Sequence, residues 1–133
     1  MSELLDNYIT IFQPADILNL TGSLDILPNI DPTQFYDVDR IILKLKYNSV
    51  PYNYGATDLI YFNIGNEHIA TLQGDSISSN HKVATVANAR LCVDLCASLI
   101  ELGETVKMYF SGSAPTLGDS EIEIITYYYL HDF

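Results

Sequence analysis

Residues 41–47 read Ile-Ile-Leu-Lys-Leu-Lys-Tyr, and this stretch decides the fold class. All of its odd-numbered positions are aliphatic or aromatic, whereas two of its three even-numbered positions are lysine. Successive side chains of a β-strand point to opposite faces of the sheet, so an alternation of period two is typical of a half-buried strand. The stretch therefore predicts a β-strand whose odd-numbered side chains face a core.

Further short β-like runs lie on both sides of this strand. Residues 59–64 and 69–72 flank Gly65-Asn66-Glu67 and predict a β-hairpin. Earlier in the chain, the runs are residues 8–12, 17–20 and 24–27. Turn-forming Gly, Pro, Asn, Asp and Ser residues separate the runs, which is the pattern of a sheet protein built from many short strands.

The last third of the chain predicts a closing hairpin. Residues 105–110 and 121–130 alternate, and the Ser-, Gly- and Pro-rich residues 111–119 join them. One face of the final strand carries Ile122, Ile124, Tyr128 and Leu130. Taken together, the runs predict an all-β, single-domain antiparallel β-sandwich, jelly-roll-like, with about eight strands.

The length of 133 residues suits one domain with a single core. We expect residues 1–16 to form an N-terminal arm or first strand and residues 17–133 to form the sandwich domain. Residues 28–39, which contain two prolines and three aspartates, are expected to be a loop.

Residues 83–101 allow two interpretations. Leu91, Leu95 and Leu99 recur at four-residue spacing, which suits a helix, but the alternation around Leu91 also suits a strand. The all-β surroundings favour a strand over residues 89–95.

The charge balance excludes some classes of partner. The chain has 17 Asp and Glu against 6 Lys and Arg, a net charge of −11 at pH 7. Such a chain repels phosphate backbones, so no nucleic-acid partner is expected. No run approaches the ~20 apolar residues of a membrane helix, and residues 1–6 lack the basic start of a signal peptide. We therefore expect no membrane partner and synthesis in a cytoplasm.

Residues that carry chemistry are present, but without the spacing that chemistry requires. The histidines lie far apart, at His68, His81 and His131. Cys92 and Cys96 have no close histidine and are expected to be buried thiols rather than zinc ligands. Asp37 and Asp39 could bind calcium, although a solvated acidic loop is the favoured interpretation. With neither a phosphate loop nor a nucleophile elbow, we predict no catalytic residue, no metal site and no cofactor.

Tyrosine is the unusual residue type, with ten copies beside no tryptophan. Tyr52 and Tyr54 suit an exposed stacking or contact surface as well as they suit buried strand positions. The final strand is also apolar on its second face, which its neighbouring sheet, a loop or another subunit would cover. The predicted interface residues are Ile125, Tyr127, Tyr129, Tyr52 and Tyr54.

A succession of features resembles one group of viral proteins. In chain order they are Ala15-Asp16-Ile17-Leu18, Leu27-Pro28, residues 41–47, Pro51-Tyr52-Asn53, residues 59–62, Val106–Phe110 and Gly118–Ile124. From Ile17 to Leu130 the chain resembles small virion proteins of tailed bacteriophages, of the head decoration, auxiliary capsid or head-fibre type; residues 83–101 depart from the pattern. The resemblance implies a β-sandwich on a capsid or tail, commonly oligomeric, with no catalytic residues to carry over.

Three functions follow as hypotheses, of which the first is favoured. It is a capsid-associated decoration or auxiliary protein that resides in the virion, forms a homo-oligomer and contacts capsid or other virion proteins. The second is a tail- or fibre-associated carbohydrate-binding module that uses Tyr52 and Tyr54 as stacking rings. The third, a small hydrolase with paired carboxylates, ranks last because no spacing brings two acids together. Head or tail location, copy number and host stay open.

Overall fold

The computed structural model describes residues 4–78, 86–87 and 101–133. Its elements in chain order are β1 (Asp6–Phe12), α1 (Pro14–Ile17), β2 (Ser23–Asp25), β3 (Gln34–Lys46), β4 (Leu59–Ile64), β5 (Glu67–Gln73), the 3-10 turn η1 (Gly74–Ser76), β6 (Val86–Ala87), β7 (Val106–Phe110) and β8 (Glu121–Asp132). No helix in the described part of the chain is long and apolar enough to cross a membrane.

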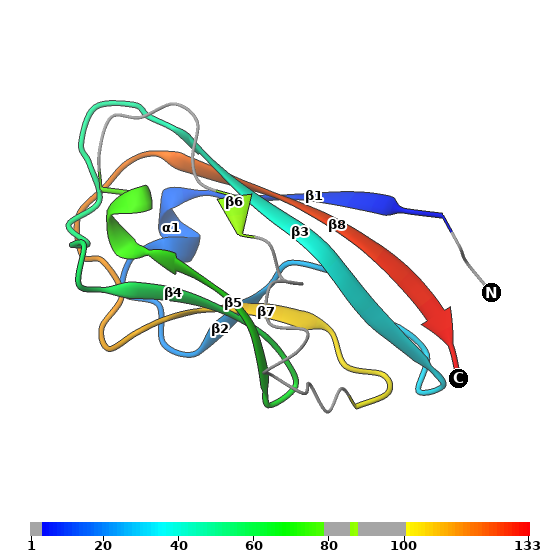
Figure 1. Cartoon of the computed structure of the whole chain (residues 1–133). Helices are drawn as coiled ribbons and strands as arrows, with labels where there is room; N and C mark the ends of the chain where they lie inside the picture. The colour runs from blue at the N-terminus through cyan, green and yellow to red at the C-terminus, as the bar shows by residue number, and fades with distance from the viewer. Residues whose placement is uncertain (1–3, 79–85, 88–100) are drawn as a thin grey trace.

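The strands form two four-stranded antiparallel sheets that pack as two layers (Figure 1). The first sheet has the order β1-β8-β3-β6 and the second sheet the order β2-β7-β4-β5. The pairing is nested, because β1 pairs with β8, β2 with β7, β3 with β6 and β4 with β5. A single long hairpin rolled into a sandwich gives this order, which defines a jelly roll. The predicted all-β sandwich of about eight strands is confirmed.

The core lies between the two sheets and takes every second residue of the long strands. Leu43 of β3 and Ile124 of β8 are cross-strand partners, and both are fully buried. Val106 and Met108 of β7 contribute from the second sheet, and Ile17 of α1 joins the same cluster. Burying a side chain of this size stabilises the fold by about 1.5–3 kcal/mol. The apolar side chains that alternate along the strands are therefore the main source of stability, because they are the ones that the core buries.

Strand β3 is longer than the predicted strand, because residues 34–39 belong to it and not to a loop. A β-bulge between Val38 and Arg40 shifts the register against β8. Tyr36 and Val38 before the bulge are buried, as is Ile41 after it. Val38 and Ile41 therefore lie on one face although an odd number of positions separates them. The extra residue of the bulge interrupts the period-two alternation, so the sequence pattern does not show one continuous strand.

The predicted closing hairpin is wrong, although both of its strands exist. β7 lies between β2 and β4 in the second sheet, whereas β8 lies between β1 and β3 in the first. Residues 111–120 therefore cross from one layer to the other. Alternation identifies a strand but does not identify its partner, and here the partners of β8 come from the first third of the chain.

Two other predictions concern short segments. Residues 17–20 do not form a strand: α1 ends at Ile17, and Pro14 occupies its first turn, where proline is favoured. The predicted strand over residues 89–95, its helical alternative and both cysteines lie outside the described residues. The hairpin of residues 59–72 is confirmed as β4 and β5.

Thr126 of β8 gives a test of core packing. Its side chain is fully buried, and no atom of the described residues hydrogen-bonds to its hydroxyl. Valine has the same shape without the hydroxyl, so we expect Thr126→Val to raise the free energy of unfolding by about 1 kcal/mol. Urea denaturation measures this change. Thr126→Ser, which keeps the hydroxyl and removes the methyl group, should instead lower it; a less stable valine variant would show that the hydroxyl has a partner.

Candidate interaction surface

Tyr52 and Tyr54 are buried inside the chain, so they do not form an exposed surface. Their exposed fractions are 1% and 3%. The Tyr52 hydroxyl donates a hydrogen bond to the carbonyl of Ser120, and the Tyr54 hydroxyl lies 2.9 Å from the carbonyl oxygen of Ser111. Burial raises the pKa of Tyr52 to about 12. The prediction of a stacking surface is wrong because backbone carbonyls satisfy both hydroxyls, which lets the apolar rings enter the core.

The carboxylate of Asp119 ties the neighbouring loops together. It accepts hydrogen bonds from the backbone N–H of Ser49 at 3.0 Å, the backbone N–H of Val50 at 2.8 Å and Nδ2 of Asn48 at 3.0 Å, and also from the Ser49 hydroxyl. These bonds, led by the one from the Ser49 hydroxyl, lower the pKa of Asp119 to about 2. Asp119 thus has structural partners. Throughout residues 4–78, 86–87 and 101–133, no group of three or more His, Cys, Asp or Glu side chains could hold a metal ion.

The other predicted interface residues share one surface. We call the face of the first sheet that points away from the second sheet the outer face. Ile125, Tyr127 and Tyr129 of β8 lie on it, because they alternate with the core residues Ile122 and Ile124. Both tyrosines are partly exposed, and Ile125 is 9% exposed without belonging to the core cluster.

The strand register adds residues that the sequence analysis missed. Ile9 of β1 and Ile42 of β3 are the two cross-strand partners of Ile125, so an apolar row crosses three strands. Ile9 and Ile11 are 52% and 47% exposed. The sequence feature that could have predicted Ile9 is in residues 8–12, Tyr-Ile-Thr-Ile-Phe, because neither face of this strand carries a charged side chain.

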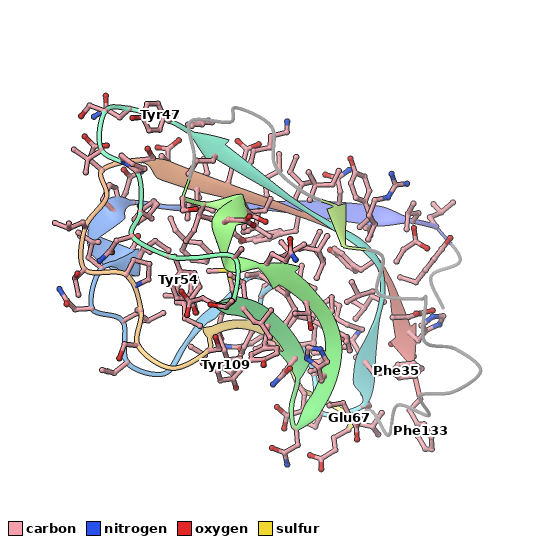
Figure 2. All side chains as sticks on the ribbon, turned by 60° about the vertical axis from the view of Figure 1, so that its left-hand side comes forward. Phe35, Tyr47, Tyr54, Glu67, Tyr109 and Phe133 are labelled. Carbon is pink, nitrogen blue, oxygen red and sulfur yellow. The ribbon has the colours of Figure 1, made fainter. Side chains whose placement is uncertain are left out.

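Aromatic side chains occupy the outer face on one side of this row. The Arg40 guanidinium carbon lies 5.5 Å from the centroid of the Tyr127 ring. Phe35 stacks on His131 with ring centroids 5.0 Å apart, and Tyr129 lies 6.3 Å from the same histidine. Figure 2 shows Phe35 near the end of the molecule where the C-terminal Phe133 lies. Tyr, Phe and Arg are the residue types enriched at protein interfaces.

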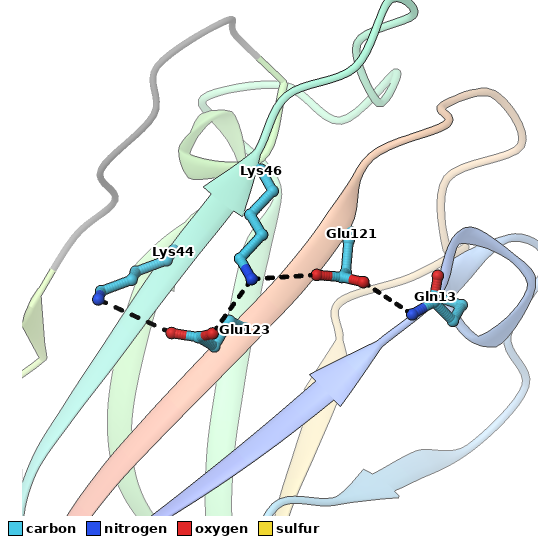
Figure 3. A network of polar contacts seen from close by, with 5 residues as sticks. All are labelled: Gln13, Lys44, Lys46, Glu121 and Glu123. Atoms are coloured by element: carbon cyan, nitrogen blue, oxygen red, sulfur yellow. Dashed lines mark hydrogen bonds and ion pairs between the residues drawn. The ribbon is translucent and has the colours of Figure 1, made fainter.

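Charged side chains on the other side of the row pair with one another (Figure 3). Lys46 Nζ lies 3.2 Å from Glu121 and 3.4 Å from Glu123, and Lys44 Nζ lies 3.7 Å from Glu123. Gln13 donates a 2.8 Å hydrogen bond to Glu121. The hydrogen bonds to Glu121 and Glu123 raise the pKa of Lys46, and those from Gln13 and Lys46 lower the pKa of Glu121. Exposed pairs of this kind add little stability, but they leave few unpaired charges beside the apolar row.

The fold has counterparts among solved structures. No protein-family model and no curated protein matches the sequence. A chain in the cyanophage Pam1 capsid asymmetric unit matches with a TM-score of 0.55 and 13% identity, over 96% of this chain and 85% of that chain. A chain in the acidic stable capsid structure of Helicobacter pylori bacteriophage KHP30 matches with a TM-score of 0.56 and 10% identity, over 100% of this chain and 97% of that chain. At these identities the likeness is one of fold: a jelly-roll sandwich spanning nearly the whole chain.

Proposed function

We propose that this protein is a non-enzymatic structural component of a tailed-bacteriophage virion, a decoration or auxiliary protein that docks on the capsid shell. The observation that carries the proposal is the match over almost the full length to chains found in two phage capsids. That agreement supports a role as a structural module of a phage particle. The resemblance of the sequence to small virion proteins of tailed bacteriophages implies the same role.

The outer face is the surface that we assign to docking on the shell protein. It combines the row of Ile9, Ile125 and Ile42 with the aromatic side chains of Tyr127 and Tyr129. The adjacent lysines and glutamates neutralise one another, so a docking partner does not have to remove water from unpaired charges. A capsid repeats each contact many times, so a modest interface of this kind is enough to hold the protein in place.

The composition of the particle tests the function. Virions purified from the phage that encodes this chain should contain it at a fixed ratio to the major capsid protein. Quantitative mass spectrometry measures the ratio, and cryo-electron microscopy should show its sandwich at symmetry-related positions on the shell. Absence from purified particles would reject the proposal, and symmetric density on the tail alone would reject the head location.

Tyr127→Lys tests the docking surface. The lysine introduces an unpaired charge beside Arg40, so we expect the affinity for particles lacking this protein to fall by at least about tenfold. Cosedimentation with such particles measures the affinity, and Tyr129→Lys should act in the same direction. Tyr109→Lys is the matched control, because Tyr109 is a partly exposed tyrosine of β7 in the second sheet. A large fall in melting temperature with docking retained would place the Tyr127 ring inside the fold instead.

A further inference from the structure

The edges of the two sheets are not equally protected. Three edge strands are described in full: β1 in the first sheet, and β2 and β5 in the second. β2 has three residues, and β5 carries Glu67 and His68 and faces a register shift in β4 between Phe62 and Asn63. Short length, charge and bulges are the devices by which proteins prevent an edge from pairing with another chain.

β1 is neither short nor bulged, and its one charged residue is Asp6 at its start. It runs for seven residues and pairs with β8 in unbroken register. From Asn7 to Gln13 the chain carries no charged residue, although the protein as a whole has a net charge of −11. Tyr8, Ile9 and Ile11 are 42%, 52% and 47% exposed. On the side away from β8, no described strand pairs with β1. Such an edge is a template for strand addition.

The space beside β1 suits an added strand. An open groove of about 370 Å³ lies between Tyr8 and Thr10 of β1 and residues 25–29. Its lining includes the buried Ile26 and Leu27, and the Thr10 hydroxyl donates a 2.9 Å hydrogen bond to the Ile26 carbonyl, which holds the two sides of the groove together. Inward-pointing side chains of an added strand would therefore enter a partly apolar groove.

We propose that β1 pairs antiparallel with β1 of a second copy of this chain, so that two first sheets become one continuous sheet. The edge is self-complementary: in a pairing centred on Thr10, Ile9 of each copy lies opposite Ile11 of the other. Branched aliphatic pairs in these positions stabilise adjacent strands. Two strongly acidic chains also meet with least repulsion along a segment without charge. A two-fold axis closes this contact, which limits it to a dimer.

The test is the mass of the isolated protein in solution, so it does not depend on the virion role. By size-exclusion chromatography with light scattering, we expect twice the 14.9 kDa of one chain. Ile11→Lys places a lysine on the β1 edge. Its cross-strand partner within the monomer is Glu123, and this opposite charge helps the variant to keep its fold. We expect this variant to raise the dimer dissociation constant by at least about tenfold. Gln73→Lys is the matched control, because it adds the same charge to an exposed position of the β5 edge strand and should leave the mass unchanged.

Hydrogen exchange identifies the strand. The β1 amides that point away from β8 should lose protection when the protein is diluted below the dissociation constant, while the β1 amides bonded to β8 and the amides of β3 stay protected. A monomeric wild-type protein at every concentration, or an Ile11→Lys variant that is folded by circular dichroism and still dimeric, would overturn the proposal. Protection of β1 only on the virion would assign the edge to a strand of another protein, and would equally overturn pairing between copies.

Discussion

Gly118→Ala is expected to lower the free energy of unfolding by about 3–5 kcal/mol, from backbone strain and overpacking together. Gly118 has φ +143°, a conformation that residues with a Cβ rarely adopt. A Cβ built on Gly118 would overlap Cδ1 of Tyr52 and would lie 2.6 Å from both Cγ and Cε1 of the same ring. That ring is buried and tied to Ser120, so it has little room to move. Because small domains are stable by only about 5–15 kcal/mol, this variant should lose much of its stability.

Gly112→Ala is the matched control for this prediction. Gly112 also has a positive φ, +63°, but among the described residues no atom other than those of its chain neighbours lies within 4 Å of the position that its Cβ would take. Gly112→Ala should therefore lower the free energy of unfolding by the cost of backbone strain alone, about 1–2 kcal/mol. Urea denaturation of the two variants at neutral pH measures how much more Gly118→Ala costs than the same substitution at an unobstructed glycine of positive φ. Equal losses would mean that the contact with Tyr52 has no energetic weight.

Tyr52→Ala is expected to lower the free energy of unfolding by about 3–5 kcal/mol, the usual cost of removing a large buried ring. The side chain is 1% exposed and its hydroxyl donates to the Ser120 carbonyl, so the variant leaves both a cavity and an unpaired acceptor. Tyr52→Phe removes only the hydrogen bond and should cost about 1–2 kcal/mol. Tyr47→Ala should cost less than Tyr52→Ala, because Tyr47 is only partly buried.

The double variant connects the two predictions. Once alanine replaces Tyr52, the ring that obstructs a Cβ at Gly118 is gone. The substitution Gly118→Ala should then cost at least about 1 kcal/mol less than it does in the wild-type protein, as expected for residues in direct contact. Additive losses in urea denaturation would show that the strain at Gly118 is entirely in the backbone.

The strands were predictable where the alternation is unbroken. The strands over residues 41–46 and 121–130 can be predicted because burying one face of a strand produces a local alternation of period two in the sequence. The first part of β3 was not predictable, since the bulge before Arg40 reverses the phase and the aspartates on both sides of Val38 resemble a loop. Strand partners were not predictable either: they are fixed by which faces fit together across the whole chain, and nothing in residues 105–130 records that β7 and β8 lie in different sheets.

The proposed docking surface was predictable in part. Ile125, Tyr127 and Tyr129 were predicted to lie on it because β8 is apolar on both faces, and a second apolar face needs its own cover. Ile9 and Ile42 were missed because only the register shows that they flank Ile125. Tyr52 and Tyr54 were assigned to the surface from their turn-like surroundings. A loop can nevertheless direct aromatic rings inward when carbonyl groups such as that of Ser120 accept their hydroxyls.

The nested order of strand pairs also has a consequence for folding during synthesis on the ribosome. β4 and β5 are neighbours in sequence and can meet as soon as both have been synthesised, whereas β1 must wait for β8. Closing such a large loop is slow, because the entropy of the intervening chain is lost before any contact compensates for it. While the ribosome completes the rest of the polypeptide, the segment Tyr-Ile-Thr-Ile-Phe therefore stays without its partner. Nascent chains crowded on one message would be most prone to join each other there.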